Sequence, residues 1–353
     1  MKKVLLISLA SRFGGGETYL EQLAPILRNR VHLYVFCIHH EVKTRMQSLG
    51  IEALCVKLAE TRAEIFRIPA GLLGLLYFRL IKGVKHVVLN GYAPAALALP
   101  ARILGFRIYL IAHLNLTQRV TFTQRLFLHR RYLTSLRFVD RVICVSEPVA
   151  AELRAIFPLK DIVAIPNWIA DVPPLNHRTH DAGELLKLLY VGRLVELKGL
   201  PLLLEALRRI PGLSLTVVGE GSLRKELEQM AEGLDVVFAG FQRATSHFFE
   251  DADLFVNPSL GPEGLPMVSL EAMAHSLPCI FSDLPIHAEI SQDGRAALLF
   301  KRGSVESLAE RIAELVADPI LRGGYAERAH RAIVEYYSAP TATGKYLRAL
   351  EVE

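Results

Sequence analysis

Short apolar stretches that alternate with helix-like stretches run along the whole sequence and constrain its fold more than any other feature. In the first half, strand-like runs cover residues 4–9, 32–38, 86–90, 107–112 and 141–145, and helix-like stretches cover 17–29, 62–82 and 119–136. A second series of strand-like runs covers residues 185–191, 214–218, 235–239, 253–256, 278–282 and 296–300. Short apolar strands with helices between them are typical of parallel sheets that are buried on both faces. The pattern therefore predicts two α/β domains.

The boundary between the two series is marked by a polar segment with Pro173, Pro174 and Gly183, which is typical of a linker. At 353 residues the chain also exceeds the usual size of one domain. We predict an N-terminal domain over 1–170, a linker over 171–184, a C-terminal domain over 185–335, and a final segment over 336–353 that packs back on the N-terminal domain. Ligands of open parallel sheets bind beyond the carboxyl ends of the strands, so two facing sheets predict an interdomain cleft.

Cysteine usage and hydropathy favour a cytoplasmic protein. The cysteines form no C-x-x-C pair and mostly lie in apolar runs, which indicates buried thiols in a reducing compartment. They are Cys37, Cys55, Cys144 and Cys279. The apolar run after Lys3 is short and is followed by Arg12, so we expect a first strand and not a signal peptide. The longest uncharged apolar stretch, residues 68–78, is too short to span a bilayer as a helix.

Charge is distributed unevenly between the two halves. Residues 1–171 contain 23 Lys/Arg and 11 Asp/Glu, a net charge of +12, and residues 65–139 contain no acidic residue. This asymmetry indicates an anionic partner. Basic and apolar residues are interleaved, which favours peripheral contact with an anionic membrane, on the inner face of the cell membrane, over nucleic-acid binding. The basic residues expected to make this contact are Arg119, Arg125, Arg130, Arg131 and Arg137.

Glu263 and Glu271 flank a predicted helix start that suits an anionic ligand. Residues 261–264 have loop composition, and Pro266 suits the first turn of a helix. The first N–H groups of a helix have no acceptors within the helix, so they can bind an anion. Carboxylates beside them can accept hydrogen bonds from the hydroxyls of a sugar or of ribose. This combination suits a nucleotide-sugar.

Two further strings follow predicted strands. Gly14, Gly15, Gly16 and Glu17 come after the first strand, where a phosphate-binding turn would lie, although three glycines there are by themselves more often only a turn. They do not form G-x-G-x-x-G, which disfavours a dinucleotide fold. A later string with Arg193 and Lys198 places two phosphate-binding cations after the strand over 185–191.

Taken in order, these strings resemble motifs of family 4 of the retaining glycosyltransferases with the GT-B fold. The string after the first strand resembles the family's G-G-x-E element, and Gly192 to Gly199 resembles G-R-x-x-x-x-K-G. Glu263 and Glu271 resemble its E-x7-E motif, with Pro-Ser upstream and Glu-Ala-Met-Ala downstream. The resemblance implies two facing Rossmann-like domains. It also implies metal-independent transfer of a hexose or N-acetylhexosamine from a nucleoside-diphosphate sugar to a glycan or lipid-linked acceptor, in bacterial cell-surface polysaccharide or glycolipid synthesis.

The same resemblance implies roles for individual residues. The residues expected to act in catalysis are His113, Arg193, Lys198 and Glu263. Those expected to bind the donor are Gly15, Gly16, Gly219, Gly221, Phe241, Gly264, Leu265, Met267, Val268 and Glu271. The sequence departs from the family pattern at Trp168, which replaces the glycine of a P-N-G turn, and at Pro266, where a glycine is common. The departure at Pro266 leaves the identity of the hexose open.

Other interpretations of these motifs remain. A GT-B isomerase that acts on a UDP-N-acetylhexosamine shares the fold and a nucleotide-binding glutamate, although the paired Arg193 and Lys198 favour transfer. A catalytically silent subunit with the same fold is a non-enzymatic alternative. Asp251 and Asp253 spell D-x-D, which ligates a metal in another class of glycosyltransferases, but they precede a buried strand, where both acids can cap structure.

Overall fold

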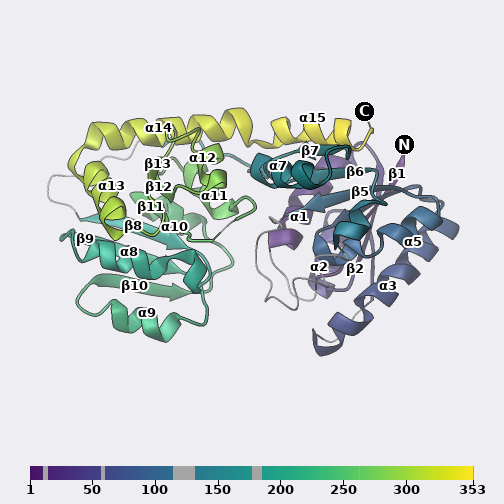
Figure 1. Cartoon of the computed structure of the whole chain (residues 1–353), viewed down its shortest axis with the longest axis horizontal. Helices are drawn as coiled ribbons and strands as arrows, with labels where there is room; N and C mark the ends of the chain where they lie inside the picture. The colour runs from purple at the N-terminus through teal and green to yellow at the C-terminus, as the bar shows by residue number, and fades with distance from the viewer. Residues whose placement is uncertain (11–14, 57–59, 114–131, 177–184, 262, 353) are drawn as a thin grey trace. The chain divides into compact units, whose positions relative to one another are not determined.

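The computed structural model describes residues 1–10, 15–56, 60–113, 132–176, 185–261 and 263–352. It divides into two compact units, which we describe separately (Figure 1). Unit 1 comprises Met1–Asn167 and Ala342–Glu353, and unit 2 comprises Trp168–Thr341. No helix among the described residues is both long and apolar enough to cross a membrane.

The described residues of unit 1 form one parallel sheet with the strand order β3-β2-β1-β4-β5-β6-β7. Its strands are β1 (Lys3–Ser8), β2 (His32–Cys37), β3 (Glu52–Cys55), β4 (His86–Asn90), β5 (Arg107–Ala112), β6 (Arg141–Cys144) and β7 (Ile162–Ala164). Its helices are α1 (Gly15–Arg28), α2 (His40–Ser48), α3 (Glu60–Leu80), α4 (Tyr92–Ala95), α5 (Ala98–Ile103) and α7 (Glu147–Ile156). In β1, β2 and β5 an exposed first residue precedes five buried ones, as expected for strands covered on both faces.

The described residues of unit 2 form a second parallel sheet, with the order β10-β9-β8-β11-β12-β13. Its strands are β8 (Leu186–Val191), β9 (Leu213–Val218), β10 (Asp235–Gly240), β11 (Leu254–Asn257), β12 (Cys279–Ser282) and β13 (Leu298–Phe300). Its helices are η1 (Glu196–Lys198), α8 (Leu200–Leu207), α9 (Arg224–Met230), α10 (Ser246–Asp251), α11 (Met267–Ala274), α12 (Pro285–Ile290), α13 (Val305–Ala317) and α14 (Pro319–Tyr336). Helix α15 (Ala339–Ala349) spans the return to unit 1.

In both sheets the chain adds three strands toward one side and then crosses back to add the remaining strands on the other side, which is the doubly wound Rossmann arrangement. Right-handed crossovers then place helices on both faces of each sheet. The prediction of two Rossmann-like α/β domains with parallel sheets is confirmed. Strands β3 and β7 were not predicted, because each is short and neither forms a continuous buried apolar run.

The unit boundary lies earlier than the predicted linker over 171–184. Trp168 is buried, and Ile169 donates its N–H to the carbonyl oxygen of Tyr337 at 2.8 Å. His330 Nε2 lies 2.8 Å from the carbonyl oxygen of Pro173. These contacts tie residues 168–173 to the end of α14, so they belong to unit 2, whereas residues 177–184 lie outside the described part. The predicted final segment began at residue 336, but the chain rejoins unit 1 only at Ala342.

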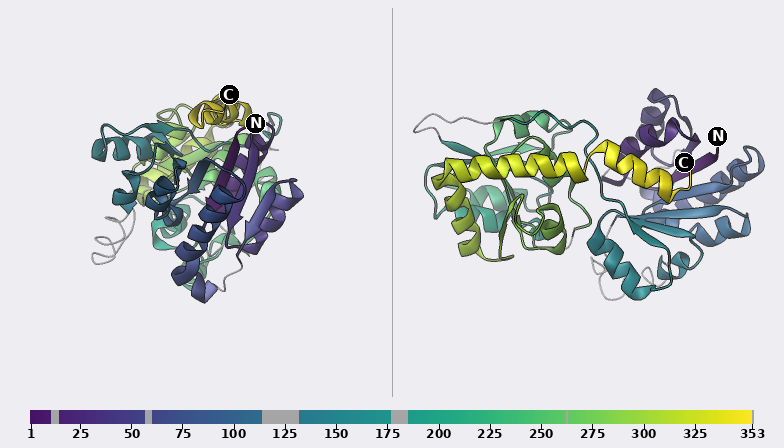
Figure 2. Two further views of the ribbon diagram at one scale, coloured as in Figure 1. Left: turned by 90° about the vertical axis from the view of Figure 1, so that its right-hand side faces the viewer. Right: turned by 90° about the horizontal axis from the view of Figure 1, so that it is seen from above.

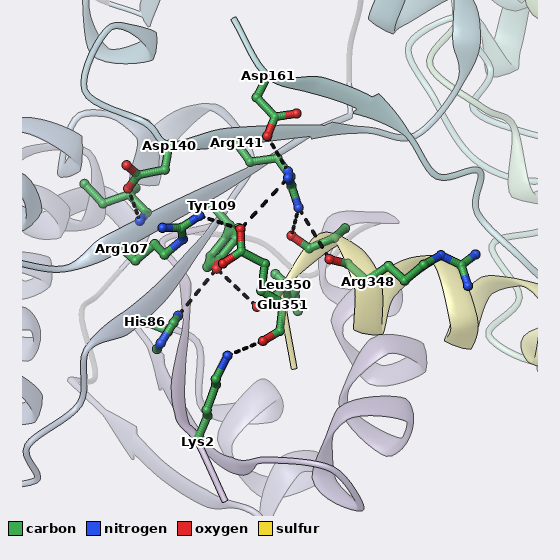
Figure 3. Close-up of polar contacts among 12 residues, drawn as sticks. Lys2, His86, Arg107, Tyr109, Asp140, Arg141, Asp161, Arg348, Leu350 and Glu351 are labelled. Carbon is green, nitrogen blue, oxygen red and sulfur yellow. Dashed lines mark hydrogen bonds and ion pairs between the residues drawn. The ribbon is translucent and has the colours of Figure 1, made fainter. Parts of the chain in front are cut away.

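The end of the chain is held at the amino ends of the unit 1 strands (Figure 3). The Glu351 carboxylate pairs with Arg107, at the start of β5, and the Glu351 carbonyl oxygen accepts a hydrogen bond from Lys2. Arg141, at the start of β6, donates to the carbonyl oxygen of Ala349 at 2.6 Å. The two termini therefore lie side by side (Figure 2), at the end of the sheet where the strands begin.

Candidate functional site

Two of the predicted motifs meet at the point where the unit 2 sheet reverses its strand order. Strand β8 pairs with β11, and the crossovers that leave these strands run in opposite directions. The loop after β8 carries Arg193 and Lys198, and the loop after β11 carries Glu263. In doubly wound sheets the crevice at such a point is where ligands bind.

Backbone contacts hold these two loops together. The carbonyl oxygen of Leu197 accepts hydrogen bonds from the N–H groups of Leu260 at 2.8 Å and Gly261 at 3.2 Å. Gly199 has a φ of +70°, and a Cβ atom at this position would lie 2.0 Å from the carbonyl oxygen of Pro258. Only glycine permits this approach, so the glycine that ends the first motif positions the second.

Lys198 and Glu263 form an ion pair at the junction of these loops. Lys198 Nζ lies 2.8 Å from Glu263 Oε2, and the two side chains are 22% and 9% exposed. Burial alone would raise the pKa of the Glu263 carboxyl, but the Lys198 ammonium, with smaller contributions from His287 and Ser259, outweighs burial and lowers it below its usual value. Glu263 Oε1 is buried and has no hydrogen-bond partner among the described residues. Because buried carboxylate oxygens normally have hydrogen-bond partners, this atom is suited to accept a hydrogen bond from a hydroxyl group of a ligand.

A buried polar network underlies the loop after β11. Asn257 Nδ2 donates to Ser269 Oγ at 3.0 Å and lies 3.3 Å from His287 Nε2. His287 Nδ1 lies 2.9 Å from the carbonyl oxygen of Ser282, whose hydroxyl donates to the carbonyl oxygen of Ser259 at 2.7 Å. Burial lowers the pKa of His287, which fits a neutral ring that donates from Nδ1 and accepts at Nε2. Sequence reasoning missed this network; the available signal was the polar residues that end two buried strands, Asn257 in β11 and Ser282 in β12.

Arg193 is the second cation of the site. Its side chain is exposed, and it forms no ion pair with any residue in the described part of the chain. The carbonyl oxygen of Arg193 accepts a hydrogen bond from Tyr190 Oη at 3.1 Å, and Tyr190 is 2% exposed. The buried tyrosine therefore fixes the backbone of the loop while the guanidinium remains free to bind an anion.

Gly219 and Gly221 allow the loop after β9 to approach the loop after β8. A Cβ atom on Gly219, whose φ is +141°, would lie 1.9 Å from the carbonyl oxygen of Gly192, and one on Gly221 would lie 2.2 Å from that of Leu194. Both predicted glycines are therefore required by close backbone packing, whether or not they also contact a ligand. Phe241 follows β10 and is 69% exposed, which leaves its ring available for stacking.

Helix α11 begins where the sequence predicts it, with Pro266 as the N-cap. Gly264 and Leu265 are buried just before it, and Met267 and Val268 are partly exposed on its first turn. The Glu271 carboxylate forms no hydrogen bond or ion pair with the described residues, and burial raises its pKa. An unpaired carboxylate with a raised pKa is suited to accept hydrogen bonds from hydroxyl groups of a ligand.

The corresponding point of unit 1 gathers a second cluster, where β1 pairs with β4. His113 follows β5, and its Nε2 lies 2.7 Å from Asn90 Oδ1. Asn90 Nδ2 donates to the carbonyl oxygen of Gly16 at 3.0 Å, and Ser8 Oγ donates to Glu17 Oε1 at 2.8 Å. Burial lowers the pKa of His113 to about 4, so its imidazole is neutral near pH 7.

Sequence reasoning missed Asn90, which links His113 to Gly16 in this cluster. It ends the apolar run of β4, and a polar residue in that position was the available signal. The ring of Tyr19 also packs edge-on against His113, with centroids 4.8 Å apart. Gly15 and Gly16 begin α1, beside Asn90, whereas Gly14 lies outside the described residues.

Two family models match the chain, one to each half. The model described as Glycosyltransferase Family 4 matches residues 13–171, and the model described as Glycosyl transferases group 1 matches residues 186–318. The chain belongs to the family 4, group 1 glycosyltransferases. The membership of family 4 that the motifs suggested is therefore confirmed, whereas these matches do not test retention of configuration.

Known proteins support the assignment to these glycosyltransferases. The lipopolysaccharide core biosynthesis glycosyltransferase LpsE of Rhizobium meliloti is 31% identical over 225 residues, which are 62% of this chain and 66% of LpsE. The phosphatidyl-myo-inositol mannosyltransferase of Mycolicibacterium smegmatis is 29% identical over 189 residues, 50% of this chain and 48% of that protein. The matches thus span less than two thirds of either relative. The crystal structure of Anabaena Alr3699/HepE with UDP shares the fold, with a TM-score of 0.83, 19% identity and full coverage of both chains.

In this chain the D-x-D string lies at the amino ends of the unit 2 strands. Asp253 Oδ2 accepts a hydrogen bond from the N–H of Lys187 at 2.8 Å, and Asp251 pairs with the Lys187 side chain at 2.9 Å. Lys187 lies near the start of β8, whereas Lys198 and Glu263 lie beyond the carboxyl ends of the strands, at the opposite end of the sheet. The two acids therefore stabilise the start of β8 and β11. No cluster of three or more metal-ligating side chains occurs among the described residues.

Proposed function

We propose that this protein is a retaining glycosyltransferase. It moves a hexose or N-acetylhexosamine from a nucleoside-diphosphate sugar to a glycan or lipid-linked acceptor on the cytoplasmic side of the membrane, in the synthesis of a cell-surface polysaccharide or glycolipid. The observation that carries the proposal is the group of Arg193, Lys198 and Glu263 at the reversal point of the unit 2 sheet. This group offers two cations and one carboxylate with an unpaired oxygen.

Departure of the nucleoside diphosphate is the difficult step of glycosyl transfer, because negative charge builds up on the leaving group. Arg193 and Lys198 would stabilise that charge together with the first N–H groups of α11, at Met267 and Val268. Fixed cations and helix dipoles perform here the role that a metal ion performs in other enzymes. We therefore propose that transfer needs no metal.

The two glutamates would bind the two sugars of the donor. Glu263 Oε1, which lacks a hydrogen-bond partner in the described structure, would accept a hydrogen bond from a hydroxyl of the transferred sugar. Glu271, whose carboxylate is also unpaired, would accept hydrogen bonds from the ribose hydroxyls. The exposed ring of Phe241 would stack on the base. His113 is proposed to contact the transferred sugar as a neutral hydrogen-bonding group.

Similar proteins support a nucleotide-sugar donor and a surface-glycan or lipid acceptor. The Anabaena HepE protein has been crystallised with UDP-glucose. LpsE is named for lipopolysaccharide core biosynthesis, and the mycobacterial relative for mannosyl transfer to phosphatidyl-myo-inositol. A nucleotide-sugar isomerase is the alternative enzyme, but the exposed Arg193 beside Lys198 suits stabilisation of a departing diphosphate.

A screen of UDP-, GDP-, ADP- and TDP-sugars tests the proposal. We expect one nucleotide family to raise the melting temperature of the protein, and its sugar to be transferred to added glycan or lipid extracts at the same rate with and without EDTA. Epimerisation of the donor without transfer would favour the isomerase. If chelation abolishes transfer and magnesium or manganese restores it, the metal-independent mechanism is wrong.

Nucleotide binding is expected to strengthen with rising pH because of Glu271. Burial raises the pKa of this carboxyl in the free protein, and hydrogen bonds donated by the ribose hydroxyls would lower it in the complex. The complex then holds fewer protons than the free protein, so affinity increases as pH rises through the raised pKa. Calorimetry should show about tenfold weaker binding and no such pH dependence for Glu271→Gln. Glu310→Gln, on the exposed face of α13, is the matched control, and an unchanged pH dependence in Glu271→Gln would contradict this role.

A further inference from the structure

His287 is a fully buried histidine that lies behind the loop carrying Glu263. It is on α12, and its ring reaches the ends of β11 and β12, which pair in the unit 2 sheet (Figure 1). Nε2 lies 3.3 Å from Asn257 Nδ2 at the end of β11, and Nδ1 lies 2.9 Å from the carbonyl oxygen of Ser282 at the end of β12. No step of the proposed reaction uses this histidine.

The hydrogen bonds around His287 fix which of its ring nitrogens carries the proton. The N–H of Ser259 lies 3.3 Å from Asn257 Oδ1, and because an N–H can only donate, Oδ1 is its acceptor. Asn257 Nδ2 therefore faces the ring and donates, so Nε2 accepts. The carbonyl oxygen of Ser282 can only accept, so the proton is on Nδ1. His287 is thus held as one neutral tautomer.

Both residues that His287 contacts hold the backbone of Ser259. Asn257 Oδ1 accepts from the N–H of Ser259, and Ser282 Oγ donates to its carbonyl oxygen at 2.7 Å. His287 Nδ1 also lies 3.1 Å from Ser282 Oγ. An amide and a hydroxyl can rotate to other partners, whereas the buried ring leaves each with one orientation. The ring therefore helps to fix the peptide groups on both sides of Ser259.

Ser259 lies four residues before Glu263, at the contact between the two loops of the site. Its hydroxyl donates to the carbonyl oxygen of Leu197 at 3.4 Å, directly before Lys198. Ser259 and His287 also contribute to the lowered pKa of Glu263. The hydrogen bonds of Ser259 thus help to set where the loop places the Glu263 carboxylate beside Lys198.

We propose that His287 is a positioning residue for the transferred sugar. Its neutral ring orients Asn257 and Ser282, these two residues hold the backbone of Ser259, and the loop then presents Glu263 to the sugar. This inference rests on the proposed role of Glu263 in sugar binding and concerns unit 2 alone. It makes no use of the expected membrane contact, for which most of the named basic residues lie outside the described part of the chain: Arg119, Arg125, Arg130 and Arg131.

Two variants of similar volume test the role of the ring. Methionine and glutamine both fill the space of the side chain, but only glutamine can accept a hydrogen bond from Asn257 Nδ2. His287→Met should slow transfer at saturating donor at least about tenfold, because buried polar groups lose their partner and the loop shifts. His287→Gln should recover most of this loss. In calorimetry, His287→Met should lose more affinity for the nucleotide-sugar than for the free nucleoside diphosphate, since the loop presents the sugar-binding carboxylate.

Ser282→Ala tests the same path without a change to the histidine. It removes the hydroxyl that donates to the carbonyl oxygen of Ser259, and it should show the same difference between the two ligands. Ser291→Ala is the matched control. Ser291 is also fully buried, but its hydroxyl donates to the carbonyl oxygen of Ala288 at 3.3 Å and accepts from the N–H of Gly294 at 3.1 Å. This control should transfer at close to the wild-type rate.

The outcomes separate this inference from the proposed function. If wild-type protein transfers sugar and a folded His287→Met does so at the same rate, the positioning role is wrong. It is also wrong if His287→Gln is as slow as His287→Met, or if both ligands lose affinity equally, because His287 then only fills space. If the wild type transfers no sugar from any donor, the proposed function fails and the inference fails with it. Thermal unfolding shows which variants are folded, and Ser282→Ala decides if His287→Met is not.

Discussion

Replacement of Lys198 by methionine is expected to slow glycosyl transfer at least about a hundredfold, because it removes a cation that acts on the charge of the departing diphosphate. Methionine keeps most of the apolar stem of the side chain. Steady-state rates with the donor found in the screen provide the measurement. Lys187→Met is the matched control, since Lys187 pairs with Asp251 at 2.9 Å at the opposite edge of the same sheet. Transfer by this control should remain near the wild-type rate.

Loss of structure is a competing explanation for a slow Lys198→Met enzyme. Without the ammonium, the Glu263 carboxylate is left largely buried and unpaired, which costs up to about 3–5 kcal/mol in fully buried pairs and less here, since Lys198 is 22% exposed. The double variant Lys198→Met/Glu263→Gln removes both charges and should regain stability. Its transfer should stay slow, because Glu263 is itself proposed to bind the reacting sugar. The deciding measurement is therefore made on Lys198→Met alone: if thermal unfolding shows it folded at the assay temperature and it still transfers at close to the wild-type rate, the proposed role of Lys198 in catalysis is wrong.

The fold could be predicted from the sequence because burial on both faces produces continuous apolar runs. Strand β1, with five buried residues in succession, is an example. Strand β3 lies at the edge of its sheet and alternates exposed and partly buried residues, so it produces no such run. The order of the strands does not follow from the runs, because pairing depends on which faces the crossover helices cover.

The site could be predicted as separate motifs but not as an arrangement. Arg193 and Lys198 were assigned to one strand end and Glu263 to another, and only the pairing of β8 with β11 brings Lys198 and Glu263 to 2.8 Å. The tight approach at Gly199 also depends on that pairing, and the contacts of His287 depend on the pairing of β11 with β12. Contacts between distant loops have no local periodicity, so a single sequence does not reveal them.

The structure also changes how Glu263 is expected to act. From the sequence it is a loop carboxylate that binds sugar hydroxyls. The ion pair adds a second effect, because Lys198 keeps the carboxylate ionised in a largely buried position, where burial alone would favour protonation. An ionised, desolvated acceptor forms stronger hydrogen bonds than a neutral one. Lys198 would therefore also strengthen the hydrogen bond that Glu263 is proposed to accept from the sugar.

Glu263→Gln is accordingly expected to reduce transfer at least about a hundredfold, because an amide oxygen replaces the charged acceptor for a hydroxyl of the reacting sugar. Its effect on binding should depend on the ligand. The variant should bind the complete nucleotide-sugar more weakly than wild type but the free nucleoside diphosphate about equally well. Glu271→Gln should weaken both ligands alike, since the ribose is common to them. Calorimetry with both ligands on both variants provides the measurement, and a Glu263→Gln protein that discriminates between the ligands as wild type does would show that Glu263 does not bind the transferred sugar.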